Sequence, residues 1–160
     1  MKKMLLVIDF QNAFINHNTI KAKADIPELI KSGEFDEVLF TRFINNKESP
    51  VYKKLNWQGC IDEKSRNICI DINGYDVIDK DKYSAFGENI CEYIKSRNIE
   101  EIYLCGIDIE CCVLVTAFNF FENGYDIYVL KDFVYCTEGE KRKNNALDIL
   151  SRNIGSQNIL

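Results

Sequence analysis

Residues 102–130, IYLCGIDIECCVLVTAFNFFENGYDIYVL, decide the fold class of this chain. Two short β-rich runs, Ile102–Gly106 and Asp126–Leu130, flank an apolar segment that is long enough for a helix. That helix would run from Cys112 to Asn123, and Gly124 would end it. A strand, a helix and a second strand in this order form the unit from which parallel sheets are built.

The same alternation of short apolar runs and helical runs continues toward both ends of the chain, which predicts a parallel α/β sheet in a single domain of residues 1–160. Continuously apolar runs are typical of strands that are buried on both faces. The further strands are expected at Met4–Asp9, Glu37–Arg42, Asp76–Asp79 and, shorter, Gln157–Leu160, and the further helices at Pro27–Ser32, Glu88–Arg97 and Lys141–Asn153.

Composition excludes several classes of function. The net charge of −5 leaves no basic patch for nucleic acid or an anionic membrane, and no apolar stretch is long enough for a membrane helix. His17 is the only histidine, which excludes a histidine-rich zinc site and any mechanism with two imidazoles. Seven cysteines, an odd number without an expected signal peptide, indicate free thiols in a reducing cytoplasm.

Ligands of open parallel sheets bind beyond the carboxyl ends of the strands. In this chain that edge would collect Asp9, Arg42, Lys82 and Cys112, which are a carboxylate, two cations and a thiol. The long excursion Asn45–Asn73 is expected to form a lid or pocket wall, because long irregular segments in compact domains are often functional.

Each of these residues has a functional and a structural interpretation. A thiol at a helix N-terminus is expected to have a lowered pKa and to act as a nucleophile, but Cys111 and Cys112 could simply be small residues between helix and sheet. Asp9 could be a general base or a loop cap, and Lys82 could bridge Asp9 and Cys112 or be a solvated surface residue.

Three motifs in order, VIDFQNAF (7–14), KYSAF (82–86) and GIDIECCV (106–113), resemble the isochorismatase-like cysteine hydrolases, the superfamily that includes nicotinamidase. The resemblance runs over essentially the whole chain. It implies a three-layer α/β/α sandwich around a six-stranded parallel sheet, no cofactor, and a homodimer or larger homo-oligomer.

The resemblance also implies the catalytic residues. Asp9, Lys82 and Cys112 would form the triad, and the backbone N–H groups of Asp108 and Cys112 would form the oxyanion hole, with a cis peptide between Ile107 and Asp108. Cys112 would attack the carbonyl of a small amide or ureide and form a thioester, which water then hydrolyses. Histidine is not needed for this mechanism.

Departures from the family pattern bear on the substrate. Ile109 and Glu110 replace a Thr-Asp pair, and the segment TRFINNKES (41–49) lacks the histidines that bind a metal in nicotinamidases, so we expect no metal. Arg42 could bind a substrate carboxylate or pair with a structural acid. We expect substrate contacts from Gln11, Phe14, Arg42 and Trp57.

Together these features predict a cytoplasmic hydrolase that cleaves a C–N bond of a small amide or ureide. Two alternatives remain open at this point: a non-catalytic module that binds a ligand or a protein, and a thiol redox protein that uses Cys112. A base such as Asp9 favours hydrolysis, since thiol exchange does not need one.

Overall fold

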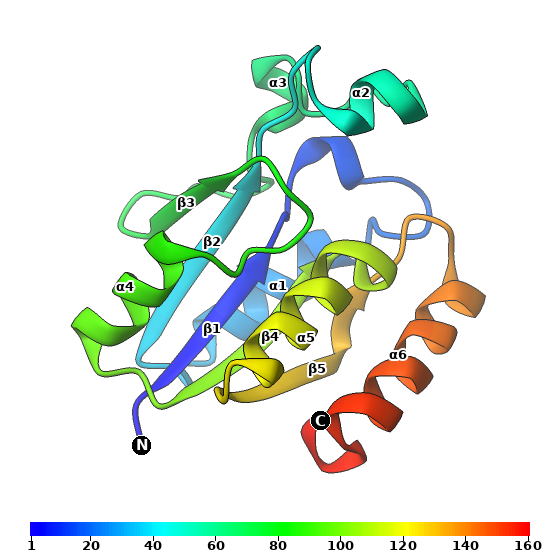
Figure 1. The fold of residues 1–160 in the computed structure, drawn as a ribbon. Coiled ribbons are helices and arrows are strands. Elements are labelled where there is room, and N and C mark those ends of the chain that lie inside the picture. The colour runs from blue at the N-terminus through cyan, green and yellow to red at the C-terminus, as the bar shows by residue number, and fades with distance from the viewer.

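The computed structural model describes all residues 1–160 and has a parallel sheet with the strand order β3-β2-β1-β4-β5 (Figure 1). The predicted α/β fold with helices on both faces is confirmed, but the sheet has five strands rather than six. The strands are β1 (Lys3–Ile8), β2 (Glu37–Phe43), β3 (Asp76–Lys80), β4 (Glu101–Ile107) and β5 (Asp126–Tyr135).

The C-terminal segment explains the missing strand. Of the predicted run Gln157–Leu160, only Ile159 forms a β-bridge, with Val129, because a 3₁₀ turn at Ser156–Asn158 uses the preceding residues. Two further hydrogen bonds hold the end of the chain against β5: Leu160 N–H donates to Val129 O (2.9 Å), and Lys131 N–H donates to Leu160 O (2.9 Å).

Helices cover both faces of the sheet, as Figure 1 shows, and give three layers. The helices α4 (Glu88–Arg97), α5 (Leu114–Glu122) and α6 (Glu140–Ile154) pack on one face, and α1 (Ala22–Lys31) packs on the other. Central strand β1 is buried from Met4 to Ile8, since it supplies side chains to both cores. None of the helices has the length and apolar character to cross a membrane.

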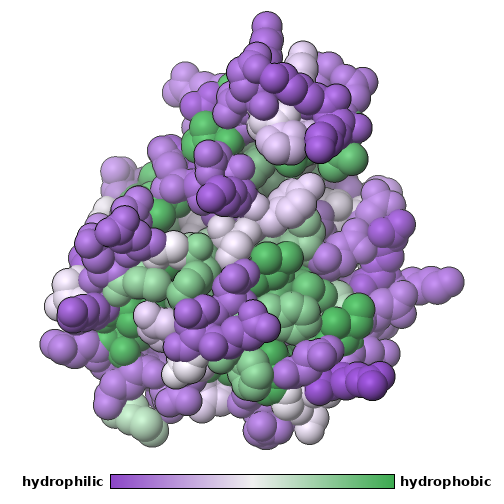
Figure 2. Space-filling model, viewed as in Figure 1, coloured by the Kyte–Doolittle hydropathy of each residue, from purple (hydrophilic) through white to green (hydrophobic).

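The start of α1 differs from the sequence-based expectation. Helix α1 begins five residues before Pro27, which lies inside the helix rather than at its start. On α6, Ile149 points outward and is 46% exposed. On α5, Phe120 is fully buried, whereas Phe121 is 44% exposed. Apolar side chains gather near the middle of the face that Figure 2 shows. Homo-oligomer formation stays a prediction.

The excursion Asn45–Asn73 lies above the carboxyl edge of the sheet (Figure 1) and contains α2 (Pro50–Leu55) and α3 (Glu63–Arg66). Ser49 caps α2 by accepting a hydrogen bond from Tyr52 N–H (3.0 Å), and Pro50 follows at the first helical position. As expected, this segment forms part of a pocket wall.

Gly106 allows β4 to lie against β1. Its φ of +120° is outside the range that other residues favour, and a Cβ there would overlap the backbone of Ile8.

We expect Gly106→Ala to lower the free energy of unfolding by about 3 kcal/mol or more, measured by urea denaturation. Gly33→Ala is the matched control, because Gly33 also has a positive φ but no atom near the added methyl group. Equal losses in both variants would contradict the steric explanation.

Candidate active site

Asp9 follows β1 at the carboxyl edge of the sheet and is fully buried. Its φ is +47°, a left-handed conformation that aspartate tolerates better than most residues. Thr41 of β2 orients it: the Thr41 hydroxyl donates to Asp9 Oδ1 (2.8 Å) and accepts a hydrogen bond from Asp9 N–H (3.2 Å). The other carboxylate oxygen, Oδ2, is therefore turned toward the cation of the site.

That cation is Lys80, not Lys82. Lys80 Nζ lies 2.6 Å from Asp9 Oδ2, and only 7% of the lysine side chain is exposed. The predicted partner Lys82 is exposed on the loop that follows β3. The correction has a simple geometric reason: β3 carries the chain into the sheet edge as far as Lys80, and the loop then turns Lys82 outward.

The Lys80 ammonium is fully engaged. Besides the Asp9 carboxylate, it donates to Lys82 O (2.9 Å) and Tyr83 O (3.0 Å), so the loop after β3 contributes its backbone rather than its lysine. Burial alone would lower the pKa of Lys80, but the negative charge of Asp9 and its hydrogen bond with Lys80 outweigh burial and raise it. Lys80 therefore stays protonated.

Cys112 lies in a π-helical turn, Ile109–Val113, that leads into α5, and it is 5% exposed. The lowered pKa expected for this thiol is wrong. A hydrogen bond with Cys111, burial, and the charge of Asp9 raise the pKa of Cys112 well above its ordinary value, against the opposing effect of Lys80. At rest the thiol is neutral, so its proton has to be removed when it reacts.

Cys111 lies beside Cys112 and has the opposite shift. The hydrogen bond with Cys112 lowers the pKa of Cys111, although burial and Asp108 oppose this. The hydrogen bond between the two neighbouring thiols therefore shifts their pKa values in opposite directions. All seven cysteines are free thiols in this structure.

Asp108 follows β4, and the Ile107–Asp108 peptide is cis, as the resemblance implies. Its carboxylate accepts two hydrogen bonds from Thr137, from the backbone N–H (2.7 Å) and from the hydroxyl (2.6 Å). Burial raises the pKa of Asp108, and the Thr137 hydrogen bonds counteract part of that effect. The side chain therefore ties the loop before Cys112 to the segment after β5.

A cavity of about 550 Å³ opens above these residues. Phe14 and Trp57, both predicted as pocket walls, lie on its wall and stack on each other with ring centroids 5.5 Å apart and an interplanar angle of 13°. Cys111 and Cys112 are at the pocket surface, whereas Asp9 and Lys80 lie beneath it. The other lining residues are Ala13, Asn16, Phe43, Val51, Leu55, Tyr83, Asp108, Glu110, Thr137 and Glu138.

Two predicted substrate contacts do not lie in this cavity. Arg42 forms a two-point ion pair with Asp79 of β3, with Nε–Oδ1 and Nη2–Oδ2 distances of 2.7 and 3.0 Å. Gln11 is fully buried, where its amide accepts a hydrogen bond from Phe43 N–H (2.7 Å) and donates to Phe43 O (3.0 Å) and Arg66 O (2.8 Å). Arg42 is thus a structural pair, and Gln11 anchors the excursion to β2.

Several pocket residues were not found from the sequence. Lys80 is the last residue of β3, and its position at the carboxyl end of a β-rich run is the only feature of the sequence that could have identified it. Tyr83 and Glu138 lie in loops whose path no local pattern predicts. No group of three or more histidine, cysteine, aspartate or glutamate side chains is arranged to hold a metal ion, and the metal-free reaction stays a prediction.

The chain belongs to the isochorismatase family. The sequence model described as "Isochorismatase domain" matches residues 3–156, almost the whole chain. Among curated proteins, it is similar to isochorismatase family protein 2A of Dictyostelium discoideum, with 24% identity over 152 residues, which is 88% of this chain and 70% of the relative. Protein 1B of the same organism is 24% identical over 86% of this chain and 65% of its own length. The chain thus spans about two thirds of these relatives.

Solved structures share the fold. The nicotinamidase PncA from Bacillus subtilis superposes with a TM-score of 0.83 at 22% identity, covering 97% of each chain. N-carbamoylsarcosine amidase from Thermoplasma acidophilum superposes with a TM-score of 0.80 at 22% identity, covering 97% of this chain and 94% of its own. At these identities the likeness establishes the architecture, and the chemistry has to be argued from the site.

Proposed function

We propose that this protein is a cysteine hydrolase that cleaves the C–N bond of a small-molecule amide or ureide through a thioester. The observation that carries the proposal is the buried Asp9–Lys80 ion pair beneath the pocket-lining thiol of Cys112. Family membership supports it, as does the amidase chemistry named for two proteins of the same fold. A buried carboxylate held next to a protonated thiol is the arrangement that general-base activation requires.

In the first half of the reaction, Asp9 takes the proton from Cys112 while the sulfur attacks the carbonyl carbon. As the proton moves, the single negative charge passes from the carboxylate to the sulfur and then to the carbonyl oxygen, and Lys80 stabilises the charge near the sulfur. The oxyanion would rest on the backbone N–H groups of Asp108 and Cys112. When the C–N bond breaks, Asp9 returns the proton to the leaving nitrogen, and ammonia or an amine departs.

In the second half, Asp9 takes a proton from water as the water oxygen attacks the thioester. The tetrahedral intermediate then collapses to the free carboxylic acid and expels the Cys112 thiolate. The thiolate takes back a proton from Asp9. One amide and one water give one acid and one amine, and the enzyme is regenerated. The residues used are all present in the chain, and no histidine takes part.

The raised pKa of Cys112 favours this mechanism over the thiol redox alternative. A thiol that reacts by exchange benefits from being a thiolate at rest. Cys112 instead stays protonated beside a base, which suits a reaction in which the proton moves during the attack.

The test is release of ammonia or amine from a panel of small amides and ureides. Cys112→Ala should abolish activity on every substrate that the wild-type protein hydrolyses, because no other nucleophile occupies that position. Cys111→Ala should retain measurable hydrolysis, and dialysis against a chelator should leave wild-type activity unchanged. Turnover that persists in Cys112→Ala would remove the thioester from the mechanism.

A further inference from the structure

The charged residues that line the active-site pocket all have the same sign. Asp108, Glu110 and Glu138 are among its lining residues, and no lysine, arginine or histidine is. Three carboxylates in the lining of one cavity give it a negative potential, which low-dielectric walls concentrate. The charge of the pocket is therefore a property that a ligand has to match.

Neighbouring cations offset only part of this charge. Arg142 pairs with Glu110 (Nη1–Oε2 3.1 Å), but the arginine side chain is 58% exposed and lies outside the cavity lining. Glu138 is exposed and has no ion pair. Asp108 has hydrogen bonds from Thr137 but no cation, and beneath the pocket Lys80 is balanced by Asp9. Of the three carboxylates in the pocket lining, only Glu110 therefore has a cationic partner.

The remaining wall is flat and apolar. The stacked rings of Phe14 and Trp57, together with Phe43, Val51 and Leu55, form the side of the cavity to which the excursion contributes. Such a surface favours planar apolar ligands. The rings bind a ligand whatever its charge, so the carboxylates decide which ligand charge the pocket accepts.

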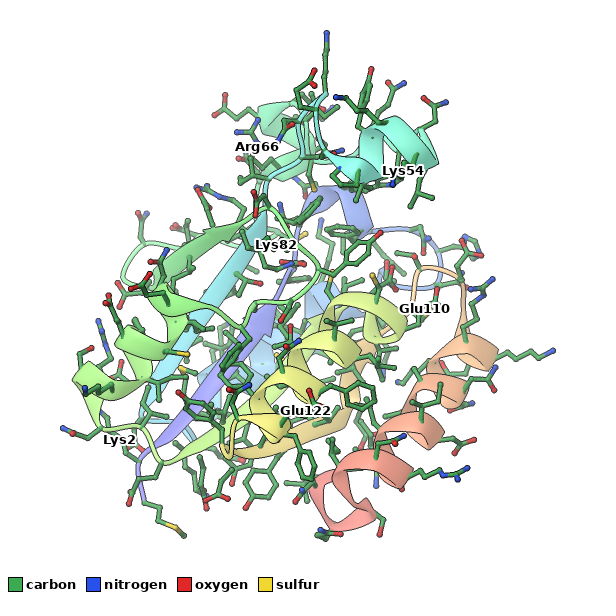
Figure 3. All side chains as sticks on the ribbon, viewed as in Figure 1. Lys2, Lys54, Arg66, Lys82, Glu110 and Glu122 are labelled. Carbon is green, nitrogen blue, oxygen red and sulfur yellow. The ribbon has the colours of Figure 1, made fainter.

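Two lysines nearby belong to a different hollow. Lys54 and Lys82 line a neighbouring depression of about 470 Å³, which shares only Val51, Leu55 and Tyr83 with the active-site pocket. In Figure 3 these lysines lie on α2 and on the loop after β3, whereas Glu110 lies in the π-helical turn that leads into α5. Their positive charges are separated from the carboxylates by this shared wall.

We infer that the pocket selects planar apolar amides whose far end is neutral or cationic, and that Glu138 and Glu110 act as specificity residues that exclude carboxylate-bearing amides. This inference rests on the proposed amide hydrolysis and names its substrate class. It replaces the expectation that Arg42 would bind a substrate carboxylate, since that guanidinium is occupied by Asp79.

The experiment compares three amides of one skeleton: benzamide, 4-(aminomethyl)benzamide and 4-carboxybenzamide. The wild-type protein should hydrolyse the cationic amide with a kcat/KM at least about tenfold above that of the anionic one, and added salt should reduce the ratio. Glu138→Gln should lower the ratio about threefold, because one carboxylate is lost. Glu140→Gln, on the exposed first turn of α6 and outside the pocket, should leave the ratio unchanged.

Binding provides a readout that does not depend on turnover. Trp57 is the only tryptophan and lies on the pocket wall, so its fluorescence in Cys112→Ala should report the same order of affinities. If the amides bind in this order but the wild-type protein hydrolyses none of them, the charge selection is supported and only the proposed reaction is contradicted. Hydrolysis that favours 4-carboxybenzamide, lost in Lys54→Met or Lys82→Met, would overturn the inference and assign specificity to the lysines. A lack of binding by all three amides would also overturn it.

Discussion

Lys80→Met is expected to reduce kcat/KM for amide hydrolysis by about 10²–10⁴-fold, the contribution typical of a positioned acid–base group. Without the ammonium, the buried Asp9 carboxylate has no counter-charge, and the negative charge that moves to the sulfur during the attack is no longer stabilised. The loss should therefore appear mainly in kcat.

Lys82→Met is the matched control for this prediction. It removes the same charge two residues away, but the Lys82 side chain is exposed and only its carbonyl contacts Lys80. Activity on a neutral amide should stay within about twofold of wild type. Because unpairing a buried charge destabilises by about 3–5 kcal/mol, urea unfolding must show that Lys80→Met remains folded at the assay temperature. A greater loss in Lys82→Met would restore the sequence-based assignment of the triad.

The sheet could be predicted because its signals are local. The apolar runs that became β1 and β4 have no alternative to burial on both faces, and Gly124 ends α5 in a way that the sequence alone predicts. The predicted sixth strand does not form, because the 3₁₀ turn at Ser156–Asn158 uses the residues that would have extended it. Only Ile159 remains to form a bridge, with Val129. Strand ends depend on such competition between neighbouring segments.

The site was predicted in kind but not in detail. Asp9 directly follows β1, and Cys112 lies in the turn after β4, so the rule that ligands bind at carboxyl strand ends found both. Lys80 was missed in favour of Lys82, because the end of β3 decides which lysine points inward and no local pattern fixes that end to one residue. The assignment of Arg42 to substrate failed for another reason: its partner Asp79 is on the adjacent strand β3.

The protonation state of Cys112 could not be predicted from the position of a thiol at a helix start. That position suggested a lowered pKa, but the π-helical turn buries the thiol against Cys111 and near the charge of Asp9. The hydrogen bond with Cys111, burial and the negative charge of Asp9 all raise the pKa of Cys112, against the effect of Lys80. The neighbouring thiol and the packing of the site thus reverse a shift that the position at a helix start favours.

Asp9→Asn is therefore expected to change two properties of Cys112 in opposite directions. Amide hydrolysis should fall by about 10³-fold or more, since the base that accepts the thiol proton is gone. The thiol itself should become more reactive toward iodoacetamide at pH 7, by about tenfold. Removing the like charge lowers the pKa of Cys112, and one pKa unit gives a tenfold larger thiolate fraction.

The measurement is best made in a Cys111→Ala background, so that alkylation near the pocket reports on Cys112 alone. Rates between pH 6 and pH 10 should follow a titration whose midpoint is lower in Asp9→Asn than in the parent. Asp148→Asn, which removes an exposed carboxylate from α6, should change neither hydrolysis nor the alkylation profile. Slower alkylation in Asp9→Asn would mean that Asp9 promotes the thiolate in the resting enzyme, and the neutral-thiol mechanism would have to be abandoned.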